Sequence, residues 1–120
     1  MPRLHNSQRL AIKGSGGILV FDVAEIASIE SDGNYLYFHT RSGFHRIRGS
    51  FVDIADKLEN ESFFQINSGT VVNLYYVREL RFLPGAAPTV ILNNGQSFNT
   101  VRRHVQDLTK RIDSLWTRGA

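Results

Sequence analysis

Short, largely apolar runs separated by polar and glycine residues fill the first half of the chain. They are rich in β-branched and aromatic residues, as strands usually are, and they occupy residues 18–22, 25–31, 34–40 and 44–49. The dipeptides Asp32-Gly33 and Ser42-Gly43 separate the last three runs. Because tight glycine turns join antiparallel neighbours, the pattern predicts an antiparallel sheet of short strands.

The residues after the fourth run change to a helical period. Ser50 and Asp53 have the spacing of a capping box, and the apolar residues that follow recur at helical spacing. The pattern predicts a short helix over 51–59. Because its outward positions are acidic, this helix would repel a polyanion, and we expect it to cover the sheet and not to contact nucleic acid.

Strand patterns return in the second half, at 77–83, 89–93 and 96–100. Asn94-Gly95 between the last two runs is a strong hairpin signal, because both residues tolerate positive φ. Asn99 or Thr100 can then cap a C-terminal helix, whose apolar stripe consists of Val101, Val105, Leu108, Ile112 and Leu115. Many short strands with one small helix inserted and another at the end predict a mainly β fold of antiparallel sheets.

The segment FFQINSGTVVNLYYVREL, at 63–80, places polar residues inside an apolar block. We expect Asn67 and Ser68 to form an exposed loop tip with buried apolar flanks, so that rigid core positions aim short polar side chains outward. Asn73 lies within the apolar run itself. Local side-chain bonding predicts that Asn73 satisfies backbone groups in a turn.

Composition indicates one compact domain. The chain has 120 residues, of which 42% are hydrophobic, enough for a single buried core. We expect one domain over 1–120, with 1–16 as an N-terminal extension and first strand and 116–120 as a tail. The absence of cysteine fits a reducing compartment, and no segment has the length of a membrane span or the apolar centre of a signal peptide. We therefore expect a soluble, cytoplasmic protein without membrane partners.

Residues that could carry catalysis are sparse. The histidines are His5, His39, His45 and His104. None stands at metal-ligand spacing, and the sequence contains no nucleophile elbow, phosphate loop or GxGxxG motif. We expect no enzyme activity, metal, cofactor or small-molecule substrate. A small hydrolase stays open as a rival function, and it would need a pocket that brings His39 or His45 to a carboxylate.

Cationic residues stand at positions where an anion would bind. The chain has 14 Lys and Arg against 11 Asp and Glu, which modestly favours an anionic partner. Arg46 and Arg48 alternate on one face of a strand, and Arg102 and Arg103 would begin the last helix, where positive charge opposes the macrodipole. The alternatives are a strand face that discourages edge pairing, for the first two, and an ion pair of Arg103 with Asp107.

Five segments stand in the order and spacing of a known family. They are IESDGNYLYFHT, FVDIADKL, FFQINSGTVVNLYYVREL, the NNG hairpin and NTVRRHVQDL. From about residue 17 to residue 115 the chain resembles the LytTR-type DNA-binding domain, the output half of many bacterial response regulators in two-component systems. The resemblance implies an elongated all-β stack of antiparallel sheets. It also implies a transcriptional regulator that binds double-stranded DNA through loops entering successive major grooves.

The same resemblance implies a set of DNA-binding residues on three reading loops, which match SDGNY, QINSG and the start of the last helix. The implied residues are Asn34, Asn67, Ser68, Thr100 and Arg102, and their positions make Tyr35, Arg48 and Arg103 further candidates for DNA binding. Arg102 is expected to bond guanine O6 and N7 together, and Asn34 and Asn67 to read adenine or bond phosphate. Arg48, Arg103 and Tyr35 are expected to contact the DNA backbone, which adds affinity without sequence information.

Partners follow from the resemblance as well. Promoters with two sites in direct or inverted repeat, and a homodimer formed on DNA, are expected of the family. The 120 residues include no receiver domain, so the chain is either a stand-alone regulator or a piece of a longer protein. The rival from another class is a protein-interaction β module without DNA binding. Its contact surface would be the aromatic residues Tyr35, Tyr37, Phe38, Tyr75 and Tyr76.

Overall fold

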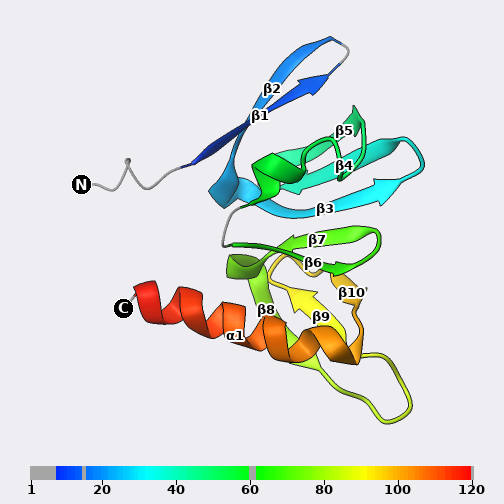
Figure 1. Ribbon diagram of the computed structural model, residues 1–120, viewed down its shortest axis with the longest axis vertical. Coiled ribbons are helices and arrows are strands. Elements are labelled where there is room, and N and C mark those ends of the chain that lie inside the picture. Colours follow the sequence, from blue (N-terminus) through cyan, green and yellow to red (C-terminus); the bar gives the residue numbers. More distant parts are fainter. Residues whose placement is uncertain (1–7, 15, 60–61, 120) are drawn as a thin grey trace. The chain divides into compact units, whose positions relative to one another are not determined.

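The computed structural model describes residues 8–14, 16–59 and 62–119 (Figure 1). Contacts within the chain divide it into two compact units, Met1–Glu59 and Asn60–Ala120. Both units are built from antiparallel strands, and the second also carries an 18-residue α-helix. The predicted mainly β class with antiparallel sheets and a C-terminal helix is therefore confirmed.

Five strands make up the sheet structure of the first unit. Strands β1 (Arg9–Gly14) and β2 (Gly17–Asp22) form a hairpin. Strands β3 (Ile26–Asp32), β4 (Tyr35–Thr40) and β5 (Gly43–Arg48) follow as an antiparallel meander. All four runs that were expected as strands in this half of the chain are strands.

One face of the meander carries most of the core of the first unit. Ile29, Leu36 and Phe38 are fully buried there, because alternate residues of a strand point to the same face. The Phe21 ring from β2 stacks on the Phe38 ring, with 4.8 Å between their centroids. The hairpin and the meander therefore share one apolar core. Tyr35 alternates to the other face, where it is half-buried.

The inserted helix is present in a shorter and tighter form than expected. Only the 3-10 helix η3 (Ala55–Leu58) forms within the predicted range 51–59, and turns precede it. The Ser50–Asp53 capping box does form, since Ser50 N donates to Asp53 Oδ2 at 2.9 Å. Ile54 nevertheless adopts φ −116° and ψ 14°, outside the helical region, and its side chain is buried. Burial of Ile54 through a turn thus replaces the first turn of an α-helix.

The second unit contains a hairpin and a three-stranded sheet. Strands β6 (Phe63–Asn67) and β7 (Thr70–Asn73) form the hairpin. Strands β8 (Val77–Arg81), β9 (Thr89–Leu92) and β10 (Ser97–Asn99) form the sheet in the order β10-β9-β8. The three strands of this sheet were expected at these places in the sequence.

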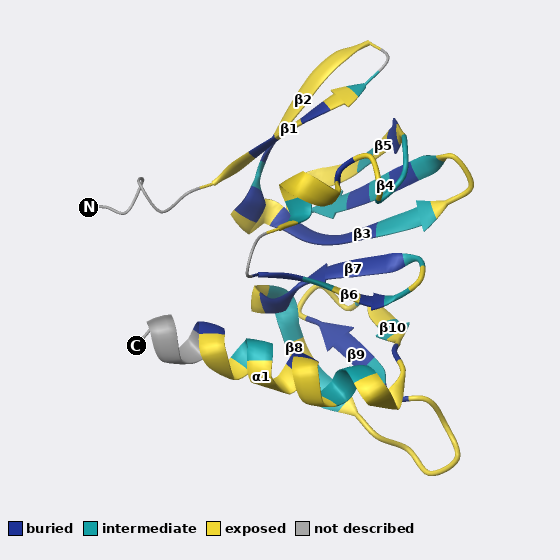
Figure 2. Ribbon diagram, in the orientation of Figure 1, coloured by how far each residue is buried: buried dark blue, intermediate teal, exposed yellow. Residues whose placement is uncertain are grey.

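Helix α1 (Arg102–Gly119) completes the second unit. Leu108 and Leu115 of the predicted apolar stripe are buried, whereas Val101 stays exposed. Strands β7 and β9 are almost wholly buried, as Figure 2 shows in dark blue. The core of this unit therefore includes the two strands and the apolar side of the helix.

Asn73 is a structural residue, as the sequence predicts. It is fully buried, and its Oδ1 accepts a hydrogen bond from Tyr75 N at 3.1 Å. This bond caps the 3-10 helix η4 (Leu74–Tyr76), which turns the chain from β7 into β8. A polar side chain inside the apolar run therefore satisfies the backbone where the run must bend.

The Asn-Gly hairpin forms with a different turn from the one expected. Gly95 has φ 92°, but among the described residues only glycines have positive φ, so Asn94 does not. Gly95 N donates to Leu92 O at 3.0 Å, and the Asn94 side chain accepts from Gln96 N at 2.9 Å. The asparagine thus stabilises the turn through its side chain, and glycine alone supplies the left-handed backbone.

Candidate nucleic-acid interface

Asn34 is exposed in the turn between β3 and β4. The turn is tight because Gly33 adopts φ 64°, a left-handed conformation that glycine takes without a steric penalty. The Asn34 carbonyl accepts from Gly49 N at 2.7 Å, which fixes this loop to the residues that follow β5. The first predicted reading loop is therefore a short, anchored turn that carries one free amide side chain at its end.

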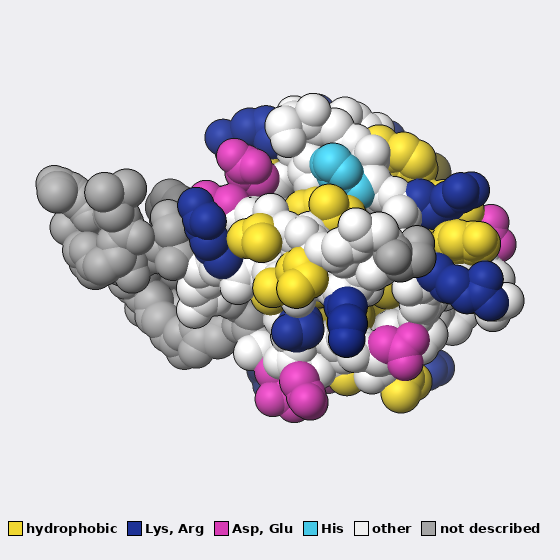
Figure 3. Space-filling model, turned by 90° about the horizontal axis from the view of Figure 1, so that it is seen from above, with side chains coloured by type: hydrophobic (Ala, Val, Ile, Leu, Met, Phe, Trp, Pro, Cys, Tyr) yellow, Lys and Arg dark blue, Asp and Glu magenta, His cyan; other side chains and the backbone are white. Residues whose placement is uncertain are grey.

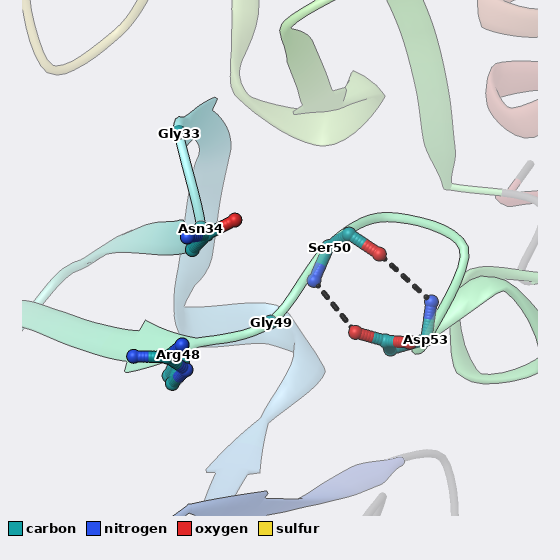
Figure 4. Close-up of a pocket in the computed structure, with 6 residues that line it drawn as sticks. All are labelled: Gly33, Asn34, Arg48, Gly49, Ser50 and Asp53. Carbon is teal, nitrogen blue, oxygen red and sulfur yellow. Dashed lines mark hydrogen bonds between the residues drawn. The ribbon is translucent and has the colours of Figure 1, made fainter.

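Arg48 lies in the same hollow as Asn34. Six residues line this hollow of about 480 Å³: Gly33, Asn34, Arg48, Gly49, Ser50 and Asp53. Figure 4 shows Asn34 and Arg48 on adjoining backbone segments, with the paired Ser50 and Asp53 on the other side of Gly49. Two predicted DNA-binding residues are thus brought together, and the Asp53 carboxylate beside them gives the hollow both charge signs.

Tyr35 is held by a neighbouring cation. It pairs with Arg48 across β4 and β5, and the Arg46 guanidinium lies 4.7 Å from the centroid of its ring. Arg46 and Arg48 are both exposed on the strand face where the sequence placed them. The cation–π contact orients Tyr35 and Arg46 together, whereas Arg48 is one of the residues that line the hollow.

Asn67 ends β6, and Ser68 and Gly69 form the turn that leads into β7. The Asn67 side chain is engaged at both ends: Nδ2 donates to Asn99 O at 2.8 Å, and Oδ1 accepts from Gly69 N at 2.9 Å. Ser68 is exposed at the tip, and its carbonyl accepts from the Gln65 side chain at 3.3 Å. The expected loop tip is present, but its two polar residues differ in how free their side chains are.

Thr100 and the two arginines that begin α1 differ in how far they are exposed to solvent. Thr100 is only 2% exposed, and its Oγ1 donates to Ile66 O at 2.7 Å. Arg102 and Arg103 are exposed at the start of α1. Among the residues that the structure describes, neither arginine has an ion pair, and the expected Arg103–Asp107 pair is not formed. Two guanidinium groups are therefore available to an anion at this helix end.

Arg81, in the same unit, forms an ion pair. Arg81 Nη2 lies 2.9 Å from Glu79 Oε1, and both side chains are exposed on β8. The hydrogen bond from Arg81 lowers the pKa of the Glu79 carboxyl, and the same bond raises the pKa of Arg81. Arg81 therefore already has an anionic partner, whereas Arg102 and Arg103 have no ion pair among the residues that the structure describes.

Lys and Arg side chains are interspersed with hydrophobic and acidic side chains on the face of the molecule that Figure 3 presents. No broad basic patch is visible on that face. The placement of single arginines at Arg48, Arg102 and Arg103 therefore matters more for anion binding than the net charge of +3.

The residues named for the alternative functions lie in different environments. Phe38 is fully buried, so it does not belong to the exposed aromatic surface that a protein-interaction module would use. His39 Nε2 lies 2.8 Å from Glu30, but the hollow at Asn34 contains no histidine. In the described part of the chain, no group of three or more His, Asp and Glu residues is placed to hold a metal ion. No helix there is long and apolar enough to cross a membrane.

Sequence reasoning did not identify Asn99 as part of this region. Its carbonyl receives the Asn67 amide from a position 32 residues earlier, and its side chain oxygen lies 3.5 Å from Thr89 Oγ1. The sequence marked it only as a possible cap of the C-terminal helix. A backbone acceptor has no sequence signature, so this contact required the folded chain.

Comparisons with known proteins agree with the fold and the motifs. The family model for the LytTr DNA-binding domain matches residues 16–113. Among solved structures, a LytTr DNA-binding domain from Bacillus cereus is similar, with a TM-score of 0.69 and 12% sequence identity. The similarity covers 87% of this chain and 95% of that one. No curated protein matches. The match of the family model over most of the sequence shows that the chain belongs to the LytTr DNA-binding domain family.

Proposed function

We propose that this domain recognises specific sequences in double-stranded DNA and acts in bacterial transcription regulation. Its three reading loops would enter successive major grooves, with Asn34 on the first, Ser68 on the second and Arg102 on the third. One observation supports the proposal. Arg102 begins α1 exposed and without an ion pair among the described residues, and it follows by two positions a segment bonded to β6 and the Ser68 turn.

Arg102 is the residue we assign to direct readout. A guanidinium can donate to guanine O6 and N7 together, and a good bidentate pair discriminates between bases by about 1–3 kcal/mol. Asn34 and Ser68 are exposed polar residues that can bond base edges or phosphate. Arg48, Arg103 and Tyr35 are assigned to the DNA backbone. Their contacts would fix the register of the protein on the duplex.

The wider setting is proposed from the family. The domain would be the output part of a cytoplasmic response regulator or a stand-alone regulator, and it would bind promoters that carry two sites in direct or inverted repeat. One domain offers three proposed arginine contacts to DNA, Arg48, Arg102 and Arg103, so two bound copies would raise the affinity for such a promoter. A homodimer on DNA is the form we expect.

The first test is selection of preferred sequences from random duplexes, followed by competition binding with single-base variants. Arg102→Ala should relax the preference at one base pair, at a cost of about 1–3 kcal/mol on the preferred duplex. Lys110→Ala is the matched control, because Lys110 is an exposed cation further along the same helix. It should leave the preference unchanged.

Two outcomes would contradict the proposal at different levels. An unchanged preference after Arg102→Ala would remove Arg102 from direct readout but leave DNA binding in place. Binding of the native domain that does not weaken with salt on any duplex would indicate that phosphates are not neutralised. In that case a protein-interaction module would be the better interpretation.

A further inference from the structure

We propose that Asn67 and Thr100 position the second and third reading loops relative to each other, and that neither acts as a DNA contact. Together with their acceptors, Asn99 and Ile66, they form what we call the loop clamp. The proposal rests on the function proposed above, since it concerns how Ser68 and Arg102 reach one stretch of DNA together.

Asn67 provides the first point of the loop clamp. Its Nδ2 donates to Asn99 O at 2.8 Å, 32 residues away in sequence, while its Oδ1 accepts from Gly69 N inside its own turn at 2.9 Å. A half-buried amide with both ends engaged has its orientation fixed by the protein. Rotation of this amide toward a base edge would break both bonds. Asn67 therefore holds the turn that presents Ser68.

Thr100 provides the second point. Its hydroxyl donates to Ile66 O at 2.7 Å, and its backbone N donates to Pro88 O at 2.9 Å. The residue is 2% exposed, so DNA could not reach the hydroxyl without displacing its neighbours. Arg102 follows two residues later. The bond to Ile66 therefore fixes where α1 begins relative to β6.

Further contacts continue the attachment along the helix. The His104 and Phe64 rings meet edge to face with 6.0 Å between centroids, and Arg111 Nη2 donates to Phe63 O at 3.0 Å. Strand β6 is thus attached to the start and to the middle of α1. Because a reading group must be held within about 0.5 Å of its working position, this attachment makes the Ser68 turn and Arg102 one rigid reading unit.

The test compares two substitutions at Thr100 that differ in one group. Thr100→Val keeps the shape and removes the hydroxyl, whereas Thr100→Ser keeps the hydroxyl. We expect Thr100→Val to reduce the discrimination between the preferred duplex and its variant at the Arg102 base pair by about fivefold, as for loss of one hydrogen bond. Thr100→Ser should restore the discrimination. Thr109→Val is the control, because it removes a hydroxyl bond to Val105 O of 2.8 Å further along α1.

A second pair of variants tests the role of the Asn67 side chain in the loop clamp. Asn67→Ala should reduce discrimination as Thr100→Val does, whereas Gln65→Ala should not, because Gln65 bonds only within the same hairpin, to Ser68 O. In the protein without DNA, ¹⁵N relaxation should show increased motion of the Ser68 and Gly69 amides in Asn67→Ala and Thr100→Val. This measurement also reports whether each variant is folded.

The results of these experiments distinguish a failure of the loop clamp from a failure of the proposed DNA-binding function on which it rests. A uniform loss of affinity on all duplexes after Thr100→Val would assign the hydroxyl to phosphate and overturn the positioning role. Unchanged discrimination in folded Thr100→Val and Asn67→Ala would also overturn it, with DNA binding intact. A native domain without any sequence preference would overturn the proposed function itself, and the positioning role with it.

Discussion

Three asparagines of this chain show how environment decides the role of one side chain. Asn34 is exposed at a turn and free to meet a ligand, Asn67 is half-buried with both amide ends bonded, and Asn73 is fully buried as the cap of η4. The amide offers the same donors and acceptors in each case. Burial and existing partners are therefore the basis on which we propose a reading role for Asn34 and a positioning role for Asn67, and they give Asn73 its structural role.

The structural role of Asn73 has a direct consequence for stability. Asn73→Ala removes the acceptor of Tyr75 N in a buried site, so the free energy of unfolding should fall by about 1–3 kcal/mol. Denaturant unfolding would measure this, with Asn93→Ala as the control at an exposed position. Base discrimination of the folded protein should stay unchanged, and a change in discrimination would mean that Asn73 also acts on DNA recognition.

At the scale of elements, the sequence predicts what local patterns determine. The strands of the meander were predictable because their segments are rich in β-branched and aromatic residues and glycine turns separate them. The 51–59 helix was overestimated because helical spacing cannot show that Ile54 is buried through a turn. The bonds of Asn67 to Asn99 and of Thr100 to Ile66 join positions far apart in sequence, so no local pattern could predict them.

At the scale of elements, the turn between β3 and β4 predicts a loss of folding stability when Gly33 is replaced. Gly33→Ala forces a residue with a Cβ into φ 64°, and no other atom lies near the added group, so backbone strain alone should cost about 1–2 kcal/mol of folding stability. Gly43→Ala is the matched control, because Gly43 also has open space around it but no positive φ. Thermal unfolding of both variants checks the difference, and equal stabilities would show that the turn tolerates another conformation.

At the scale of the whole molecule, the affinity for DNA can depend on the net charge or on the positions of a few arginines. The chain carries a formal charge of +3, and arginine Arg81 is already paired with Glu79. Arg48 in contrast lies exposed in the hollow beside Asn34. A cation that contacts phosphate releases counterions on binding, so it contributes to the dependence of affinity on salt, whereas a distant surface cation contributes little.

Arg48→Ala should therefore weaken binding to all duplexes by a similar factor and reduce the slope of log affinity against log salt by about 0.9, the value for one phosphate contact. Lys57→Ala makes the same change in net charge from an exposed position on η3, next to Asp56. Titrations over a series of salt concentrations would compare the two slopes. If both variants reduce the slope equally, net charge governs the affinity, and the assignment of Arg48 to the DNA backbone is wrong.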